Sequence, residues 1–133
     1  MCEKVWAGAF RSAEEMRHYY AVMGPMYARS YDAAAAEAGR ARTIHSPDAL
    51  NQAFGPDGFL RRFDLRGELG RITAPTLVLA GRHDWICPPE FSEEIARLIP
   101  QADLRVFERS SHSIRSDEPE AMVDAILGFV VYR

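Results

Sequence analysis

The fold of this chain is decided by residues 73–112, which begin Thr73-Ala-Pro-Thr-Leu-Val-Leu-Ala-Gly-Arg-His-Asp84 and end Ala102-Asp-Leu-Arg-Val-Phe-Glu-Arg-Ser-Ser-His112. The run 76–80 is β-branched and aliphatic, is too short for a helix, and is bounded by a proline and a glycine. Such a run is typical of a strand that is buried on both faces of a parallel sheet. A second strand is predicted from Leu104 to Phe107.

Helical patterns follow both predicted strands. Pro88-Pro89 opens the first, whose apolar residues are Phe91, Ile95, Leu98 and Ile99. The second starts near Ser116, has acids in its first turn, and is expected to bury Met122, Val123, Ile126, Leu127 and Val130. Strand, helix, strand and helix in this order predict an α/β fold with parallel strands and a right-handed crossover over residues 71–133.

Residues 1–70 have a different character, namely short helices separated by glycine and proline. The first spans 12–23 and opens with the capping box Ser12-Ala-Glu-Glu15. The second spans 33–38, with Gly39 placed just past its end, and the third runs from Ser46-Pro47 to Gly55. Two segments are therefore predicted, a helical one over 1–70 and an α/β one over 71–133.

Aromatic and methionine side chains recur at helical spacing in the first segment. Either they pack between helices, or some of them line an apolar pocket beneath a helical lid. As pocket residues we name four positions, three in the first segment and one after the first strand: Tyr19, Tyr20, Met23 and Trp85.

Composition excludes several classes of function. The chain has 133 residues, 47% hydrophobic and 26% charged, with a net charge of −3. That balance is typical of one globular domain, and it offers no basic patch for nucleic acid. No apolar run reaches the length of a membrane span, and the N-terminus is not a signal peptide, so we expect a cytoplasmic protein. Cys2 and Cys87 form neither a disulfide framework nor a zinc motif.

Asp84 and His112 follow the two predicted strands, four residues after Ala80 and five after Phe107. Ligands bind beyond the carboxyl ends of parallel strands, so both side chains are expected at one site. A carboxylate that accepts from one imidazole nitrogen fixes the tautomer and leaves the other nitrogen to take a proton from a nucleophile. Taken singly, the aspartate could cap a helix and the histidine could be solvated. Together they are predicted to be catalytic.

The stretch Ile72-Thr-Ala-Pro-Thr-Leu-Val-Leu-Ala-Gly-Arg-His-Asp84, followed by Ser111-His112-Ser113, resembles the last two strands of an α/β-hydrolase. The Glu118-Pro119-Glu120 helix start and the stretch 55–65 are similar to proline iminopeptidase-related members. The resemblance implies that Asp84 and His112 are the triad acid and base, that residues 1–70 are a cap, and that residues 71–133 are the C-terminal part of the core.

The chain departs from that family because it contains no Gly-x-Ser-x-Gly nucleophile elbow. Ser110, Ser111 and Ser113 lie too close to the histidine in sequence to serve it. Cys87, beside a predicted helix start that would lower its pKa, is either a replacement nucleophile or a small residue packed at the pocket edge. A metal site formed by His83, Asp84, His112 and Asp117 stays an alternative, although no cofactor and no metal are expected.

We therefore expect a partial serine hydrolase that acts on an ester or an N-terminal peptide bond. It would supply the acid and the base, its nucleophile would come from a preceding segment, and the isolated chain would be inactive. The alternative is a non-catalytic binding or oligomerising module derived from such an enzyme. A two-stranded sheet is unstable alone, so we also expect association with itself or with an N-terminal hydrolase half through the unpaired edge of the first strand.

Overall fold

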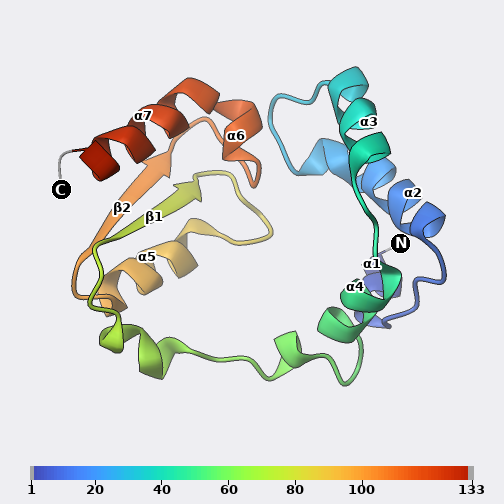
Figure 1. Cartoon of the computed structure of the whole chain (residues 1–133), viewed down its shortest axis with the longest axis horizontal. Coiled ribbons are helices and arrows are strands. Elements are labelled where there is room, and N and C mark those ends of the chain that lie inside the picture. The colour runs from blue at the N-terminus through green and yellow to red at the C-terminus, as the bar shows by residue number, and fades with distance from the viewer. Residues whose placement is uncertain (1, 132–133) are drawn as a thin grey trace. The chain divides into compact units, whose positions relative to one another are not determined.

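The computed structural model describes residues 2–131, which form two compact units (Figure 1). One unit comprises the chain up to Pro25 together with Asp32–Asp64, and the other comprises Met26–Tyr31 together with the chain from Leu65 onward. The short segment Met26–Tyr31 thus belongs to the second unit, although its neighbours in sequence belong to the first.

The second unit contains the predicted βαβα arrangement. Its strands are β1 (Thr76–Gly81) and β2 (Ala102–Phe107), its helices α5 (Pro89–Leu98), α6 (Ile114–Asp117) and α7 (Pro119–Val131), and a 3₁₀ helix, η3 (Arg66–Arg71), precedes β1. The two strands are parallel, in a register that pairs Thr76 with Ala102 and Gly81 with Phe107. Because both strands end at the same place, the loops that follow them leave from one edge of the sheet.

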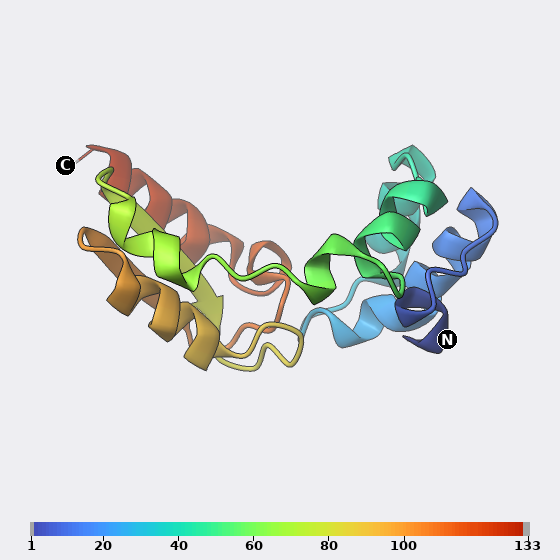
Figure 2. The ribbon, with the colours of Figure 1, turned by 90° about the horizontal axis from the view of Figure 1, so that it is seen from below.

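Helices lie on both faces of this small sheet. Figures 1 and 2 show α5 on one face and α7 along the other. Ile99, at the end of α5, and Phe107, at the end of β2, are among the few buried apolar residues of the unit. The core of this unit is therefore small.

The prediction that α7 buries its apolar face is wrong for most of the residues that carry it. Val123, Ile126, Leu127 and Val130 are exposed, the last of them to 68%. Along β1, too, Thr76–Leu79 are only half buried, where burial on both faces was predicted. The physical reason is that a sheet of two strands is too narrow to cover the whole apolar face of α7.

The first unit contains α1 (Cys2–Trp6), α2 (Ala13–Met23), α3 (Ala33–Arg42), α4 (Pro47–Phe54) and a 3₁₀ turn, η2 (Phe59–Arg61), and a further 3₁₀ turn, η1 (Gly24–Met26), follows α2. Its buried apolar residues are Val5, Phe10, Met16, Tyr19 and Met23. Asn51 of α4 joins the N-terminal loop to this core, because its side chain accepts from the Phe10 N–H at 3.0 Å and donates to the Phe10 carbonyl at 2.7 Å.

The predicted helix boundaries are largely confirmed in this unit. Ser12 caps α2 by accepting from the Glu15 N–H at 3.2 Å, and Ser46 caps α4 in the same way. The prediction for Gly39 is wrong, because α3 continues through this glycine to Arg42. Its last turn is closed by Thr43, whose hydroxyl donates to the Gly39 carbonyl at 2.9 Å.

Candidate functional site

Asp84 lies in the tight turn that follows β1. Its backbone N–H donates to the Gly81 carbonyl at 3.2 Å, which accounts for the Gly-x-x-Asp spacing. Oδ1 accepts from the N–H groups of Ile86 and Cys87, at 2.9 and 3.0 Å. The residue is only 9% exposed, so these bonds hold the carboxylate in one orientation while Oδ2 remains for another partner.

His112 supplies that partner from the loop after β2. Its Nδ1 lies 2.9 Å from Asp84 Oδ2. The Asp84 side chain is 8% exposed and the His112 side chain 36%, so a buried carboxylate holds a ring that solvent can reach. When Nδ1–H donates to Asp84, Nε2 carries the lone pair and can accept a proton. In this arrangement Asp84 can orient the His112 ring, and His112 can act as a base through Nε2.

The two loops that carry this pair are joined by backbone contacts. The His83 N–H donates to the Ser110 carbonyl at 2.9 Å, and the Ser111 hydroxyl donates to the His83 carbonyl at 3.1 Å. A Cβ at Gly81 would lie well under 3.0 Å from the Ser111 carbonyl oxygen. Glycine is thus required at the end of β1 for the two loops to meet.

Two acids at the junction of α6 and α7 hold the loop before His112. Glu118 accepts from the Ser110 hydroxyl at 2.8 Å and from the Arg109 N–H at 3.0 Å, and these bonds lower the pKa of its carboxyl. Asp117 accepts from the Ser111 N–H at 2.8 Å. Burial raises the pKa of Asp117, but hydrogen bonds from Ser111, from Ser30 and from the Arg29 N–H outweigh it, so the pKa is lowered overall.

The hydroxyls of the two serines before His112 are bonded to other groups. Ser110 is fully buried and its hydroxyl donates to Glu118, while Ser111 is 5% exposed and its hydroxyl donates to a carbonyl. Both hydroxyls are used to fix the loop. That neither serine serves the histidine stays a prediction.

Cys87 lies near the pair but is poorly suited to attack. Its Sγ is within 4.8 Å of ligand atoms of Asp84 and His112, and the residue is exposed. Burial of the thiol, followed by the negative charge of Asp84, raises its pKa. The expected lowering by a helix start is therefore wrong, since thiolate is the reactive form.

The four-residue metal set considered from the sequence is not gathered. His83 Nε2 lies 3.1 Å from the Glu108 carbonyl, and Asp117 is bonded to Ser30 and to the Ser111 backbone. Among residues 2–131, the group of potential ligands at this place is Asp84, Cys87 and His112. Its carboxylate and imidazole are already bonded to each other.

Two aromatic side chains stand beside the pair in the same unit. Trp85, half exposed, donates from Nε1 to the Met26 carbonyl at 2.7 Å. The Tyr27 ring lies edge-to-face against the His112 ring, at 5.5 Å between centroids, and against Trp85 at 6.5 Å. The sequence predicted Trp85 at the site but missed Tyr27. In the sequence, only the helix break at Gly24-Pro25 indicates that the chain passes from the first unit to the second before Tyr27.

The remaining predicted pocket residues belong to the first unit. Tyr19 and Met23 are 8% and 7% exposed in its core, and Tyr20 packs edge-to-face on Tyr19 at 5.1 Å. These contacts favour the packing interpretation for Tyr19 and Met23. Their role toward a substrate stays a prediction.

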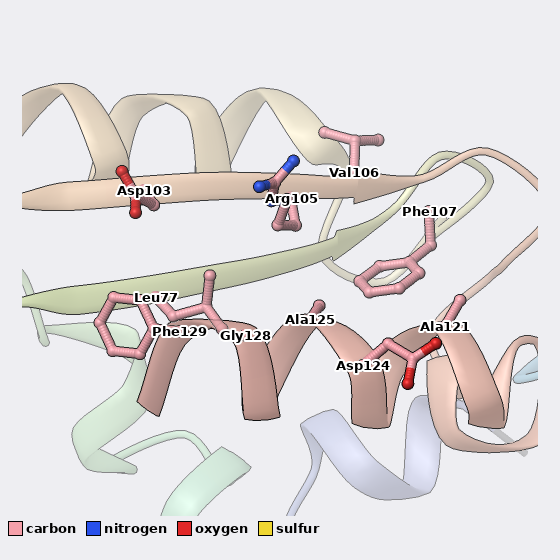
Figure 3. Close-up of a pocket in the computed structure, with 10 residues that line it drawn as sticks. All are labelled: Leu77, Asp103, Arg105, Val106, Phe107, Ala121, Asp124, Ala125, Gly128 and Phe129. Atoms are coloured by element: carbon pink, nitrogen blue, oxygen red, sulfur yellow. The ribbon is translucent and has the colours of Figure 1, made fainter. Parts of the chain in front are cut away.

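A cavity of about 610 Å³ lies elsewhere, between the sheet and α7. Figure 3 shows its lining side chains, which come from β1, β2 and α7 and include neither Asp84 nor His112. Asp103, Arg105 and Phe107 share the β2 face toward α7. This cavity reflects the incomplete layer beneath α7 and is separate from the acid–base pair.

Comparison with known families assigns the fold. A family model described as the alpha/beta hydrolase fold matches residues 6–119. The chain belongs to the alpha/beta hydrolase fold family. Asp84 and His112 both lie within the matched residues. The family assignment confirms the α/β fold class and the resemblance seen in the two strand ends.

Relatives of this α/β hydrolase chain include a peptidase and esterases. It is 38% identical to a proline iminopeptidase of Pestalotiopsis fici over 119 residues, which are 90% of this chain and 42% of the relative. It is similar to the esterase of Exiguobacterium antarcticum, with 25% identity, a TM-score of 0.72, and coverage of 97% and 48% of the two chains. It is also similar to a thermophilic esterase from Thermogutta terrifontis, with 28% identity, a TM-score of 0.69, and coverage of 98% and 49%.

The chain thus spans less than half the length of the relatives that it matches. Within residues 2–131, no helix is long and apolar enough to cross a bilayer.

Proposed function

We propose that this chain supplies the acid and the base of a serine hydrolase of the α/β type, with Asp84 as the acid and His112 as the base. The observation that carries the proposal is the 2.9 Å contact between Asp84 Oδ2 and His112 Nδ1, made by a carboxylate whose other oxygen accepts two backbone N–H groups. This arrangement fixes the tautomer and directs Nε2 toward a nucleophile.

The bond that is cleaved is an ester or an N-terminal peptide bond. Support comes from the relatives, which are a proline iminopeptidase and two esterases. Both reactions are acyl transfers that need a nucleophile, a base and an oxyanion hole. The sequence has no Gly-x-Ser-x-Gly motif, so the nucleophile and the oxyanion hole come from a complementing hydrolase segment.

Residues 1–70 act as a cap in this proposal, and residues 71–133 as the C-terminal part of the core. Trp85 contributes to substrate binding, because its half-exposed ring packs against Tyr27, whose ring contacts the base. Tyr19, Tyr20 and Met23 of the cap are proposed to shape an apolar substrate pocket. Substrates are small molecules or short peptides.

Complementation tests the proposal. The chain is assayed alone, and then co-expressed with the part of the Pestalotiopsis fici proline iminopeptidase that lies outside the matched region, using p-nitrophenyl acetate and proline p-nitroanilide. We expect no turnover by the chain alone and turnover by the mixture. Asp84→Asn should lower kcat by roughly 10⁴, because the ring then adopts the wrong tautomer, and His112→Ala should lower it at least as much.

The matched control is His18→Ala, which removes an exposed histidine of α2 and should leave kcat unchanged. Turnover by the isolated chain that disappears in Cys87→Ala would contradict the proposal. So would a fluorophosphonate label on any serine of this chain. A mixture that turns over equally well with His112→Ala would remove the histidine from the mechanism.

A second candidate function is a non-catalytic binding or oligomerising module. The exposed apolar face of α7 favours it, because such a face is a common docking surface. If the complemented chain stays inactive but remains bound to the other half, this candidate replaces the first.

A further inference from the structure

The segment Met26–Tyr31 contacts the loops that carry Asp84 and His112, although it comes from a distant part of the sequence. Its Tyr27 ring meets the His112 ring at 5.5 Å between centroids, with the two planes 76° apart. An edge-to-face contact of this kind contributes about 0.5–1.5 kcal/mol and restricts the rotation of the imidazole. The orientation of His112 therefore depends on Tyr27 as well as on Asp84.

Both strand-end loops bind the backbone of this segment. The Ser113 N–H donates to the Tyr27 carbonyl at 2.8 Å, one residue beyond His112. On the other side, Trp85 Nε1 donates to the Met26 carbonyl at 2.7 Å, one residue beyond Asp84. These bonds hold the Met26 and Tyr27 end of the segment beside the pair. The other end, at Ser30, is held by another group.

Asp117 is that group, and it holds the segment and the His112 loop at once. Its Oδ1 accepts from the Ser30 N–H at 2.7 Å and from the Ser30 hydroxyl at 3.1 Å. Its Oδ2 accepts from the N–H of Ser111, the residue just before His112, at 2.8 Å. One carboxylate therefore uses its two oxygens to join two segments that are more than 80 residues apart in sequence.

We propose that Asp117 is a positioning residue for His112, because it fastens the Tyr27 segment to the His112 loop and so sets the orientation of the imidazole. That His112 acts as a base rests on the proposed function, whereas the orientation of its ring by Asp117 can be tested without it. Ionisation suits this role, since only a carboxylate offers an acceptor on both sides, and the hydrogen bonds that lower the pKa of Asp117 favour the ionised form.

Glu118 is a neighbouring acid with a different task. It binds Ser110 and Arg109, both before the histidine in the same loop, and within residues 2–131 its side chain makes no hydrogen bond to the Tyr27 segment. Removal of the Glu118 carboxylate should therefore loosen only the His112 loop. Removal of the Asp117 charge should also release the Met26–Tyr31 segment from that loop. This difference provides a matched pair of variants.

The experiment is NMR of the whole chain with labelled histidine and tyrosine. In the wild type, the His112 ring protons should show NOEs to the Tyr27 ring and a shift produced by that ring, which Tyr27→Leu abolishes and Tyr27→Phe keeps. In Asp117→Asn, the amide has one acceptor oxygen and its NH₂ faces an N–H donor, so one of the two tethers is lost. We expect loss of the Tyr27–His112 NOEs and a shift of the His112 signals toward those of a solvated histidine.

Controls separate positioning from stability. Asp124→Asn removes an exposed charge from α7 and should leave the His112 signals unchanged. Glu118→Gln should lower the melting temperature while the NOEs persist. Asp117→Asn that lowers the melting temperature but retains the NOEs and shifts would contradict the proposal and make Asp117 a purely structural residue.

If Asp117→Asn does not fold, Ser30→Ala decides, because it removes only the hydroxyl from the tether. Weaker Tyr27–His112 NOEs in Ser30→Ala, restored in Ser30→Thr, would support the proposal. Unchanged NOEs in Ser30→Ala would overturn it. These outcomes are independent of turnover, so failure of the hydrolase proposal would be visible separately.

Discussion

At the scale of single residues, Gly81 shows how closely the two loops of the site approach each other. A side chain here would meet the carbonyl oxygen of Ser111, a backbone atom that cannot turn aside. We expect Gly81→Ala to destabilise the chain by about 1–3 kcal/mol and to displace the loop that carries His112. Urea unfolding measures the first effect and the His112 NMR signals the second. The comparison variant is Gly67→Ala, where a Cβ meets nothing within 4 Å and no such loss is expected. Equal effects in both variants would contradict the close approach.

The acids Asp117 and Glu118 predict how stability depends on pH. The pKa of each carboxyl is lowered in the folded chain, Asp117 by hydrogen bonds that outweigh burial and Glu118 chiefly by the Ser110 hydroxyl. Their contribution is therefore present above the unfolded pKa values of about 3.9 and 4.3 and is lost as pH falls through the lower folded values.

Unfolding free energies measured from pH 7 to pH 3 should fall steeply below about pH 4.5. The double variant Asp117→Asn, Glu118→Gln should be less stable at pH 7 and show a shallower fall on acidification. An identical pH slope in the double variant and the wild type would show that other carboxyls govern acid stability.

At the scale of elements, α7 carries an apolar face that the chain itself does not cover. Leu127 is 54% exposed and Ile99 only 5%. We expect Leu127→Ala to change the stability of the monomer by no more than about 0.5 kcal/mol, and Ile99→Ala to cost about 2–5 kcal/mol. Urea unfolding at low protein concentration measures both. A loss above about 2 kcal/mol in Leu127→Ala would mean that the face is covered in solution.

The elements also show what a sequence can and cannot predict. Local signals placed most boundaries well, because the caps at Ser12 and Ser46 and the proline start of α5 act through nearby backbone groups. The end of α3 was predicted too early. The helix continues through Gly39 although glycine costs about 1 kcal/mol relative to alanine, and the Thr43 hydroxyl closes its last turn. Burial of α7 was overestimated because periodicity reports which face is apolar, and says nothing about whether another element covers it.

The candidate site was predictable where both partners follow strands. Asp84 and His112 could be paired from the rule that parallel strands deliver their loops to one edge. Tyr27 and Asp117 could not, because their contacts join segments far apart in sequence and no local pattern encodes that meeting. Such positions are visible only once the chain is folded.

At the scale of the whole molecule, the chain matches less than half of its relatives' length, and its described residues, 2–131, form a sheet of two strands. β2 pairs with only one edge of β1, so the other edge of β1 is open, and small sheets with open edges tend to associate. We expect the chain to sediment as a dimer or larger species at micromolar concentration, and as a heterodimer when the complementing hydrolase half is present. A folded monomer in analytical ultracentrifugation, under both conditions, would contradict this.

The claim that Asp84 holds His112 as a base is tested most directly by the tautomer of the His112 ring. Nitrogen-15 NMR of the intact chain at about pH 9, where an ordinary histidine is neutral, distinguishes the two ring nitrogens. We predict a proton on Nδ1 and a lone pair on Nε2, with the preference lost in Asp84→Asn, while exposed His18 shows averaged tautomers in both. A proton on Nε2, or averaging at His112 in the wild type, would contradict the account.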